Sequence, residues 1–275
     1  MGSTGTLVTV HGNMGNSFAG RTIAITGGGS GIGLAITRSL AALDATVYVA
    51  DIMSDAPSEL RGLPNVHFIS NCDITQRTAC TEFMDRIPGN LYGLVNCAGI
   101  CPNEGKMASD ELFARIMAIN VTGSWNMGTE AIKRMTQQKQ GSDSGLLPDT
   151  KRTLGAGVIV NIASGASLRG IANLAAYCTS KHAVLGMTRS WAKDWPTLRV
   201  NAVAPGVTDT PLSRGATSAT GNKEELEKLA LQLSSRIPLG RMAYATDIAD
   251  VVLFTLSDAA SFMTGQVIPV NGGSD

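Results

Sequence analysis

The stretch that decides the fold is TIAITGGGSGIG, residues 22–33. It begins with a β-branched, apolar run that predicts a short strand, and glycine dominates the residues that follow. Apolar side chains then recur at helical spacing, at Ile32, Ala35, Ile36, Leu40 and Leu43. The sequence therefore predicts a strand, a glycine-rich turn and a helix in immediate succession.

The same alternation continues along most of the chain. Strand-like runs are separated mostly by segments of helix length, which is the pattern of a parallel sheet with helices on both faces. We therefore expect an α/β protein with one Rossmann-type domain and a doubly wound, parallel, seven-stranded sheet. In such sheets, ligands bind beyond the carboxyl ends of the strands, where the strand order reverses. The expected strands are residues 22–26, 46–50, 66–70, 91–95, 157–162, 198–204 and 266–270.

The composition of four segments predicts the domain organisation. Residues 1–19 are rich in Gly, Ser, Thr and Asn without periodicity, which predicts an irregular arm before a single domain at 20–275. The polar segment 137–156 contains Gly and Pro, and we expect a surface insertion there. Residues 208–240 follow the sixth expected strand, which is a suitable place for a lid over the cleft.

Composition and charge exclude several classes of partner. Lys and Arg together number 22, as do Asp and Glu, so no broad electrostatic field favours nucleic acid. The five cysteines are odd in number and match no zinc spacing, so we expect reduced thiols and no metal. No apolar run approaches the ~20 residues of a membrane span, and the N-terminus does not look like a signal peptide. A cytoplasmic location is the resulting expectation.

The glycine-rich turn is suited to a dinucleotide. Glycine is needed where the backbone takes a positive φ or approaches a pyrophosphate, and the following helix N-terminus offers free N–H groups. No Gly-Lys-Ser/Thr follows, so the turn is not a P-loop, and the strict G-x-G-x-x-G spacing is absent. A purely structural turn remains the alternative.

Asp51 strengthens the dinucleotide interpretation. It ends the second expected strand, about 20 residues beyond the glycines, where a carboxylate can bind both hydroxyls of the adenine ribose. The same carboxylate would repel a 2′-phosphate, and Ser30 rather than a basic residue precedes Gly31. We therefore expect NAD, with NADP less favoured. The alternative is that Asp51 is an ordinary solvated strand end.

Taken together, the motifs resemble the short-chain dehydrogenase/reductase family, in its subgroup with a T-G-x-x-x-G-x-G turn. The resemblance covers nearly everything from Arg21 to Gly273. The chain departs from the family's common residues at Cys97, Thr208 and Asn271, none of which is a catalytic position. The matching elements are residues 26–33 with Asp51, then Asp73, Asn96-Cys97-Ala98-Gly99, Asn120, Ser164, Tyr177-x-x-x-Lys181 and Pro205-Gly206.

The resemblance implies a catalytic tetrad and a set of cofactor contacts. The tetrad is Asn120, Ser164, Tyr177 and Lys181, with Asn120 holding a water that relays protons from Lys181. The implied cofactor contacts are Gly27, Ser30, Gly31, Ile32, Gly33, Asp51, Ile52, Asp73, Ile74, Asn96, Ala98, Gly99, Tyr177, Lys181, Pro205, Gly206, Thr208 and Thr210.

These residue types suit hydride transfer between a nicotinamide and an alcohol or ketone. Loss of hydride from an alcohol carbon requires a base for the hydroxyl proton, and Tyr177 is the expected base. Its reference pKa of about 10 is high for this role. Lys181 lies on the same helical face, and a charge about 4 Å away is worth roughly 4 kcal/mol, or about 3 pKa units, at a dielectric near 20. Lys181 can also bind the nicotinamide ribose, and Ser164 can bind the substrate oxygen.

Other functions and the substrate itself stay open. A lyase or epimerase could use the same cofactor site, and a non-catalytic NAD-binding scaffold could keep the fold. The loop 165–171 and the lid mix small and apolar residues, so we expect a hydrophobic or polycyclic secondary alcohol or ketone, with Leu168 and Ile171 as walls. The family resemblance implies a homodimer or homotetramer.

Overall fold

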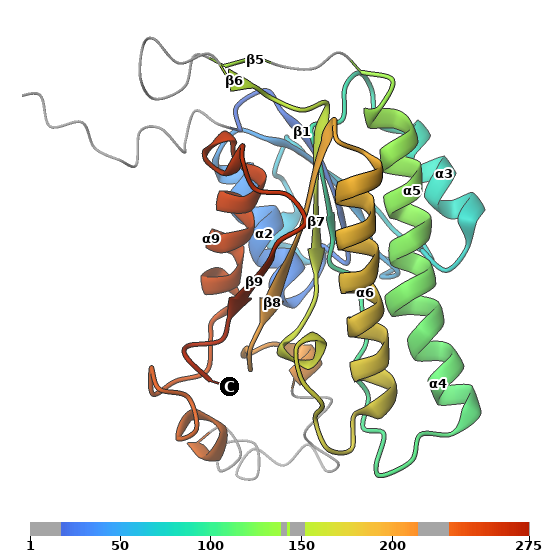
Figure 1. Cartoon of the computed structure of the whole chain (residues 1–275). Coiled ribbons are helices and arrows are strands. Elements are labelled where there is room, and N and C mark those ends of the chain that lie inside the picture. The colour runs from blue at the N-terminus through green and yellow to red at the C-terminus, as the bar shows by residue number, and fades with distance from the viewer. Residues whose placement is uncertain (1–17, 139–141, 144–151, 214–230, 275) are drawn as a thin grey trace, which may run out of the picture.

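The computed structural model describes residues 18–138, 142–143, 152–213 and 231–274. A seven-stranded sheet of order β3-β2-β1-β4-β7-β8-β9 runs through its centre, and every pairing in it is parallel (Figure 1). The predicted doubly wound α/β fold is therefore confirmed. The strands are β1 (Thr22–Thr26), β2 (Thr46–Ala50), β3 (Val66–Ile69), β4 (Gly93–Asn96), β7 (Gly157–Ile162), β8 (Leu198–Pro205) and β9 (Val267–Val270).

Burial on both faces explains why the central strands are apolar throughout. All six residues of β7 and all eight of β8 are buried, because helices cover both sides of the sheet. The predicted strands agree with the observed ones to within two residues, the largest difference being that β4 begins at Gly93.

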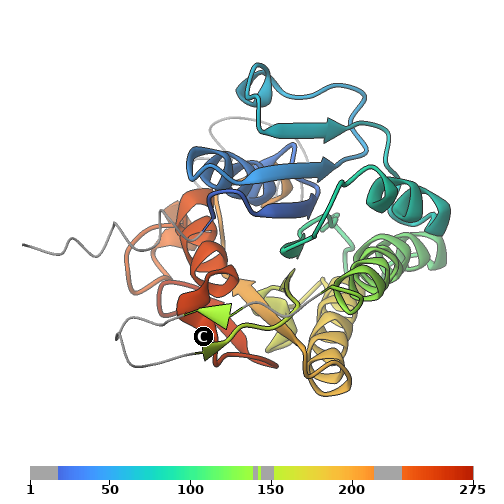
Figure 2. The same ribbon diagram turned by 90° about the horizontal axis from the view of Figure 1, so that it is seen from above.

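Helices form two layers around the sheet (Figures 1 and 2). One core lies between the sheet and the pair α2 and α9, and the other lies between the sheet and α3, α5 and α6. The helices are α2 (Gly31–Ala42), α3 (Arg77–Asp85), α4 (Asp110–Met117), α5 (Ser124–Met135), α6 (Ala175–Asp194) and α9 (Ala245–Leu256), with short turns η1 (Ser58–Leu60), η3 (Gly165–Ser167) and η4 (Asp258–Ala260).

The helical stretch that begins at Asp110 is interrupted. A π-helical segment, η2 (Ala118–Gly123), separates α4 from α5 and contains Asn120. Such π turns add a residue to the helical repeat and are frequent at functional sites. The sequence pattern did not predict this change, because apolar periodicity continues through it.

Three predicted segments lie partly outside the described residues. Phe18, at the end of the predicted arm, is fully buried with the β1 side chains, so the compact domain includes it, whereas residues 1–17 are not described. Within the predicted insertion, β5 (Ser142–Asp143) pairs antiparallel with β6 (Arg152–Thr153), at the edge of the sheet opposite η3 (Figure 1). Residues 214–230 of the predicted lid are also outside the described ranges. The assignments of arm, insertion and lid stay predictions.

The sheet order places its switch point between β1 and β4. From β1 the chain moves outward through β2 and β3, and then returns to β4 on the other side of β1. All the carboxyl ends meet at one edge, so the segments that follow β1, β4, β7 and β8 converge there.

Candidate active site

A cavity of about 610 Å³ opens at the carboxyl edge of the sheet. Its volume is in the range of sites for small molecules and cofactors. Among the predicted site residues, all but Asn96 and Asn120 line it. The lining set is Gly27, Ser30, Gly31, Ile32, Gly33, Asp51, Ile52, Asp73, Ile74, Ala98, Gly99, Ser164, Tyr177, Lys181, Pro205, Gly206, Thr208 and Thr210.

The glycine turn is packed too closely for side chains. Gly27 has a φ of +66°, and a Cβ there would lie 2.7 Å from the Cα of Ala98. A Cβ on Gly33 would lie 2.1 Å from the carbonyl oxygen of Gly27. The Ser30 side chain makes no capping bond to α2, so the free N–H groups at this helix start are available to an anion.

Asp51 and Asp73 lie at one end of the cavity. The Asp51 carboxylate is 7% exposed and accepts N–H bonds from Gly29 (2.8 Å) and Met53 (3.1 Å). Asp73 accepts the Thr75 N–H at 3.0 Å and its hydroxyl at 2.8 Å. Among the described lining residues, the cationic side chains are Arg115, Arg169 and Lys181, and none lies on β2 or the glycine turn.

Asn96 supports the sheet rather than the cavity. Its side chain is 3% exposed, and Nδ2 donates to Asn161 Oδ1 at 2.9 Å and to the Ser124 carbonyl at 3.3 Å. This side chain does not line the cavity, and the implied contact of Asn96 with the cofactor stays a prediction. Asn96 is the last residue of β4, and strand alternation turns its side chain into the protein interior.

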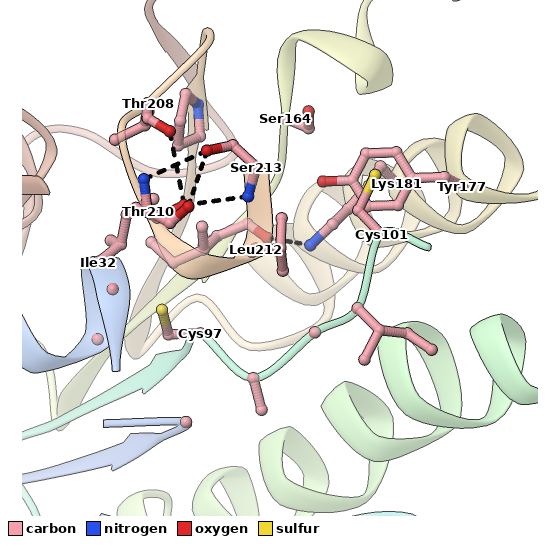
Figure 3. Close-up of a pocket in the computed structure, with 18 of the residues that line it drawn as sticks. Ile32, Cys97, Cys101, Ser164, Tyr177, Lys181, Thr208, Thr210, Leu212 and Ser213 are labelled. Carbon is pink, nitrogen blue, oxygen red and sulfur yellow. Dashed lines mark hydrogen bonds between the residues drawn. The ribbon is translucent and has the colours of Figure 1, made fainter. Parts of the chain in front are cut away.

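The predicted reacting groups converge at the centre of the cavity (Figure 3). Tyr177 and Lys181 lie one turn apart on α6, and the Tyr177 hydroxyl points into the open space. The Lys181 Nζ lies 5.8 Å from the centre of the Tyr177 ring and donates to the Ile162 carbonyl at 2.8 Å. Ser164 follows β7, and its Oγ accepts the Ala166 N–H at 3.1 Å.

Burial dominates the electrostatics of the pair. It raises the pKa of the Tyr177 phenol above its ordinary value, with the nearby Cys101 adding to the rise and the Ser164 side chain opposing it. Burial also lowers the pKa of Lys181 from 10.5 to about 8. The structure therefore does not lower the Tyr177 pKa as expected, because loss of hydration is the largest influence on the phenol.

Asn120 lies behind the cavity wall, within η2. It is fully buried, its Oδ1 accepts the Ile100 N–H at 2.9 Å, and its Nδ2 donates to the Ile100 carbonyl and to Ser180 Oγ, both at 3.0 Å. A Cβ placed on Gly99 would lie 3.2 Å from Asn120 Oδ1 and 3.5 Å from Lys181 Nζ. Both polar groups therefore approach Gly99.

Loops after β7 and β8 form the other end of the cavity. Thr210 and Ser213 hold one another: Ser213 Oγ donates to the Thr210 carbonyl at 2.9 Å, and the Thr210 N–H donates to Ser213 Oγ at 3.2 Å (Figure 3). Ile171 lines the cavity as predicted, whereas Leu168 does not and is 46% exposed.

Comparison with known proteins agrees with this geometry. A short-chain dehydrogenase family model, described as enoyl-(acyl carrier protein) reductase, matches residues 27–275. The chain is 36% identical over 273 residues to 2-(S)-hydroxypropyl-CoM dehydrogenase 3 of Xanthobacter autotrophicus, with 94% of this chain and 98% of that protein aligned. It is 32% identical to cis-4-hydroxycyclohexanecarboxylate dehydrogenase of Sinomonas cyclohexanicum, with the same two shares aligned.

A solved structure shows the same fold. Aldohexose dehydrogenase of Thermoplasma acidophilum superposes with a TM-score of 0.80 at 31% identity, covering 94% of this chain and 95% of that chain. The chain belongs to the short-chain dehydrogenase/reductase family. It is therefore an oxidoreductase that acts on alcohol or ketone substrates, and the family uses a nicotinamide cofactor.

The cavity of this short-chain dehydrogenase/reductase fits such a cofactor. The turn packs so closely on its own backbone that Gly27 and Gly33 have no room for Cβ atoms, Ser30 does not cap the α2 N-terminus, and a carboxylate lies at the end of β2. These three features are a compact glycine turn, free N–H donors and an acceptor for the ribose, which a dinucleotide site requires.

Several lining residues were not predicted from the sequence. Cys101, Arg115 and Ile119 come from a loop and helices whose positions depend on the fold. Arg115 has the spacing of an ordinary solvated helix face, so no local signal could have identified it.

Two histidines that could in principle transfer protons, His67 and His182, have structural contacts instead. His67 stacks on Tyr48 with ring centres 4.5 Å apart, and His182 bonds the Cys178 carbonyl through Nδ1. Within the described ranges there is no group of three or more His, Cys, Asp or Glu side chains that could hold a metal. In the same residues, no helix is both long and apolar enough to cross a membrane.

Proposed function

We propose that this protein is an NAD-dependent dehydrogenase or ketoreductase of secondary alcohols and ketones. The observation that carries the proposal is that Tyr177, Ser164 and Lys181 share one cavity with the glycine turn and Asp51. When bound, the nicotinamide ring accepts hydride from the alcohol carbon or donates it to the ketone carbon.

The cofactor is held mainly by backbone and by small side chains. The N–H groups at the start of α2 bind the pyrophosphate, and Asp51 accepts hydrogen bonds from both hydroxyls of the adenine ribose. Asp51 is already fixed by two backbone N–H groups, so its charge is pre-oriented. A 2′-phosphate placed against this carboxylate would meet like charge, which favours NAD over NADP.

Three side chains handle the proton and the substrate oxygen. Tyr177 takes the hydroxyl proton during oxidation and returns it during reduction, and Ser164 donates a hydrogen bond to the substrate oxygen as charge develops on it. Lys181, whose pKa of about 8 leaves it mostly protonated at neutral pH, binds the nicotinamide ribose and stabilises the Tyr177 phenolate. The raised pKa of the Tyr177 phenol means that this stabilisation must develop within the loaded site.

Asn120 belongs to the path by which a proton passes between Lys181 and solvent. Because Asn120 Oδ1 and Lys181 Nζ both approach Gly99, a water near Gly99 could accept a proton from the lysine. Both N–H donors of Asn120 are engaged by Ile100 and Ser180, whereas its Oδ1 accepts one hydrogen bond and has a second lone pair left, so we propose that Asn120 holds this water while it fixes the Ile100 backbone.

The substrate end suggests a hydrophobic alcohol or ketone that also carries an anionic group. Ile171 and Leu174 provide apolar walls, and Arg115 and Arg169 line the same cavity. Neither guanidinium group has a hydrogen bond or ion pair with any part of the chain that the structure describes. A guanidinium without a partner favours a carboxylate or another oxyanion. One relative is named for a cyclic hydroxycarboxylate, which has this combination of groups.

The test is a Tyr177→Phe variant assayed with NAD and NADP in parallel. We expect turnover to fall by at least about 100-fold, because the proton-transfer group is lost, while NADH binding followed by fluorescence is unchanged. Tyr48→Phe is the matched control, since both tyrosines are 8% exposed but Tyr48 does not line the cavity. Wild-type turnover by Tyr177→Phe would contradict the assigned role.

The same assay separates the alternatives. A lyase or epimerase returns the nicotinamide to its starting state in each cycle, so it would convert substrate without net cofactor reduction. A non-catalytic scaffold would bind NADH without turnover. The cytoplasmic location and the homodimer or homotetramer stay predictions, which fractionation and analytical ultracentrifugation can check.

A further inference from the structure

A buried carboxylate outside the tetrad contacts the catalytic helix. Glu104 lies in the segment between β4 and α4 and is 6% exposed. No salt bridge to it occurs within the described ranges. A carboxylate removed from water needs compensating donors, so its contacts indicate why it is there.

Its two oxygens bind the first turn of α6. Glu104 Oε2 accepts the Ala176 N–H and Oε1 accepts the Tyr177 N–H, each at 2.8 Å. These amides are at the second and third helical positions, whose N–H groups have no partner within a helix. The N-cap residue is Leu174, which has no side-chain acceptor, so a residue more than 70 positions away supplies the cap.

The helix start compensates for burial of the charge. Aligned peptide dipoles give a helix N-terminus a partial positive charge, and hydrogen bonds from N–H groups to an ionised acceptor are about twice as strong as neutral ones. Glu104 thereby holds the backbone of Tyr177 itself.

The segment that carries Glu104 is also a wall of the cavity. Its residues 97–101 line the cavity, and the Asn120 amide ties Ile100 to Ser180 on the second turn of α6. The segment is therefore attached to α6 at two points, through Glu104 before the tyrosine side chain and through Asn120 after it. Tyr177 lies between the two attachments, on the turn that Glu104 caps.

We propose that Glu104 is a positioning residue that fixes the Tyr177 hydroxyl relative to the substrate and the cofactor. This inference rests on the proposed role of Tyr177. A small displacement of a proton-transfer group lowers the rate strongly, because the reacting atoms must lie within hydrogen-bond reach. Glu104 itself touches no reacting atom.

The test compares Glu104→Gln and Glu104→Asp with the wild type. Glutamine retains one accepting oxygen but places an NH₂ donor against the second backbone N–H. We expect kcat to fall about tenfold to 100-fold in Glu104→Gln, while NADH affinity stays within about twofold, because the Asp51 end is not touched. Aspartate keeps the charge and both acceptors on a shorter side chain, and we expect it to restore part of kcat. Glu82→Gln, an exposed acid on α3, is the control and should match the wild type.

Two further measurements separate positioning from general loss of structure. Hydrogen exchange at the Ala176 and Tyr177 amides should be faster in Glu104→Gln, while exchange in β7 and β8 is unchanged. The solvent deuterium isotope effect on kcat should increase, because proton transfer becomes the slower step. If Glu104→Gln is too unstable to purify, the same two measurements on Glu104→Asp decide the question.

The possible failures are distinguishable. If wild type and Glu104→Gln have equal kcat and equal isotope effects, the positioning role is wrong and the proposed function stands. A fall in kcat that equals the loss of folded, NADH-binding sites also overturns the positioning role. If Tyr177→Phe retains full turnover, the role of Tyr177 fails, and the positioning of its hydroxyl by Glu104 fails with it.

Discussion

The two ends of the cavity are built in different ways. At the Asp51 end, main-chain groups define the shape: Gly27 and Gly33 leave no room for Cβ atoms, and backbone N–H groups hold the carboxylate. At the Arg169 end, side chains from loops define the shape, and the rim is exposed, with Leu212 at 42% and Ile171 at 37%.

The difference shows how one fold can keep its cofactor and change its substrate. A backbone-defined end tolerates almost no substitution, because every change moves the chain itself. A side-chain-defined end can be altered residue by residue without disturbing the sheet. Substitutions at the two ends should therefore differ in kind as well as in size.

The largest effect is expected from Gly33→Ala. The added Cβ would lie 2.1 Å from the Gly27 carbonyl oxygen, so the turn must move, and we expect a loss of about 3 kcal/mol or more of unfolding free energy. Gly186→Ala is the control, since this exposed glycine within α6 has open space around its Cβ position, and it should gain about 0.5–1 kcal/mol. Urea unfolding measures both. Equal stability of Gly33→Ala and wild type would show that the turn is not defined by its backbone.

Replacement of Asp51 should change which cofactor is preferred. In Asp51→Asn, we expect the ratio of kcat/KM for NAD to that for NADP to fall about tenfold to 100-fold, because hydrogen bonds to a charged group are worth ~1.5–3 kcal/mol. Asp73→Asn lies at the same end and should leave the ratio unchanged. Steady-state assays with both cofactors test this, and an unaltered ratio in Asp51→Asn would remove the basis for NAD selection.

Lys181, between the two ends, should make stability depend on pH. Its pKa is 10.5 when solvated and about 8 in the fold, so between these values the unfolded chain binds more protons. This group's contribution to stability therefore rises with pH across that window and is constant below it. The unfolding free energy of wild type minus that of Lys181→Met should increase by about 2 kcal/mol from pH 7 to pH 10.

The comparison with Lys181→Met is needed because other buried groups lower the unfolding free energy as pH rises. Burial raises the pKa of the Cys97 thiol to about 12 and that of Cys101 to about 11, so both disfavour the folded state as pH increases above 9. They are present in both proteins. Urea unfolding at the two pH values gives the difference, and a difference independent of pH would mean that Lys181 is not buried as a charge.

The smallest effect is expected at the substrate end. Arg169→Gln should lower kcat/KM about fivefold to tenfold for an alcohol substrate that carries a carboxylate and leave the methyl ester of that substrate unaffected, because only the acid gains from the guanidinium. Arg38→Gln, an exposed arginine on α2, is the control. A parallel loss for acid and ester would indicate that Arg169 supports the loop and does not select an anion.

Local pattern was sufficient for most of the fold. Each strand of the large sheet was predicted to within two residues, because strands buried on both faces carry continuous apolar runs that glycine turns interrupt. The motifs also identified about half of the cavity lining, since parallel strands bring their carboxyl ends to one edge whatever the details of the helices.

Other features depended on contacts between distant segments. The π turn contains Asn120, whose buried side-chain amide bonds to Ile100 and Ser180. The apolar periodicity of the sequence gives no sign of such a contact between distant segments. The inward direction of Asn96 follows from strand register, which a motif match does not include.

The sequence by itself determined the sheet, the glycine turn and the identity of the groups in the cavity, because these depend on local periodicity and on residue type. Only the tertiary structure decided their electrostatics and their support. Burial raises the pKa of the Tyr177 phenol, although the Tyr177–Lys181 spacing predicted the reverse. Packing of the chain also brings Glu104 to the start of α6, where the Glu104 carboxylate caps the helix. Hydration loss and long-range hydrogen bonds are properties of the packed chain, and no single segment of sequence contains them.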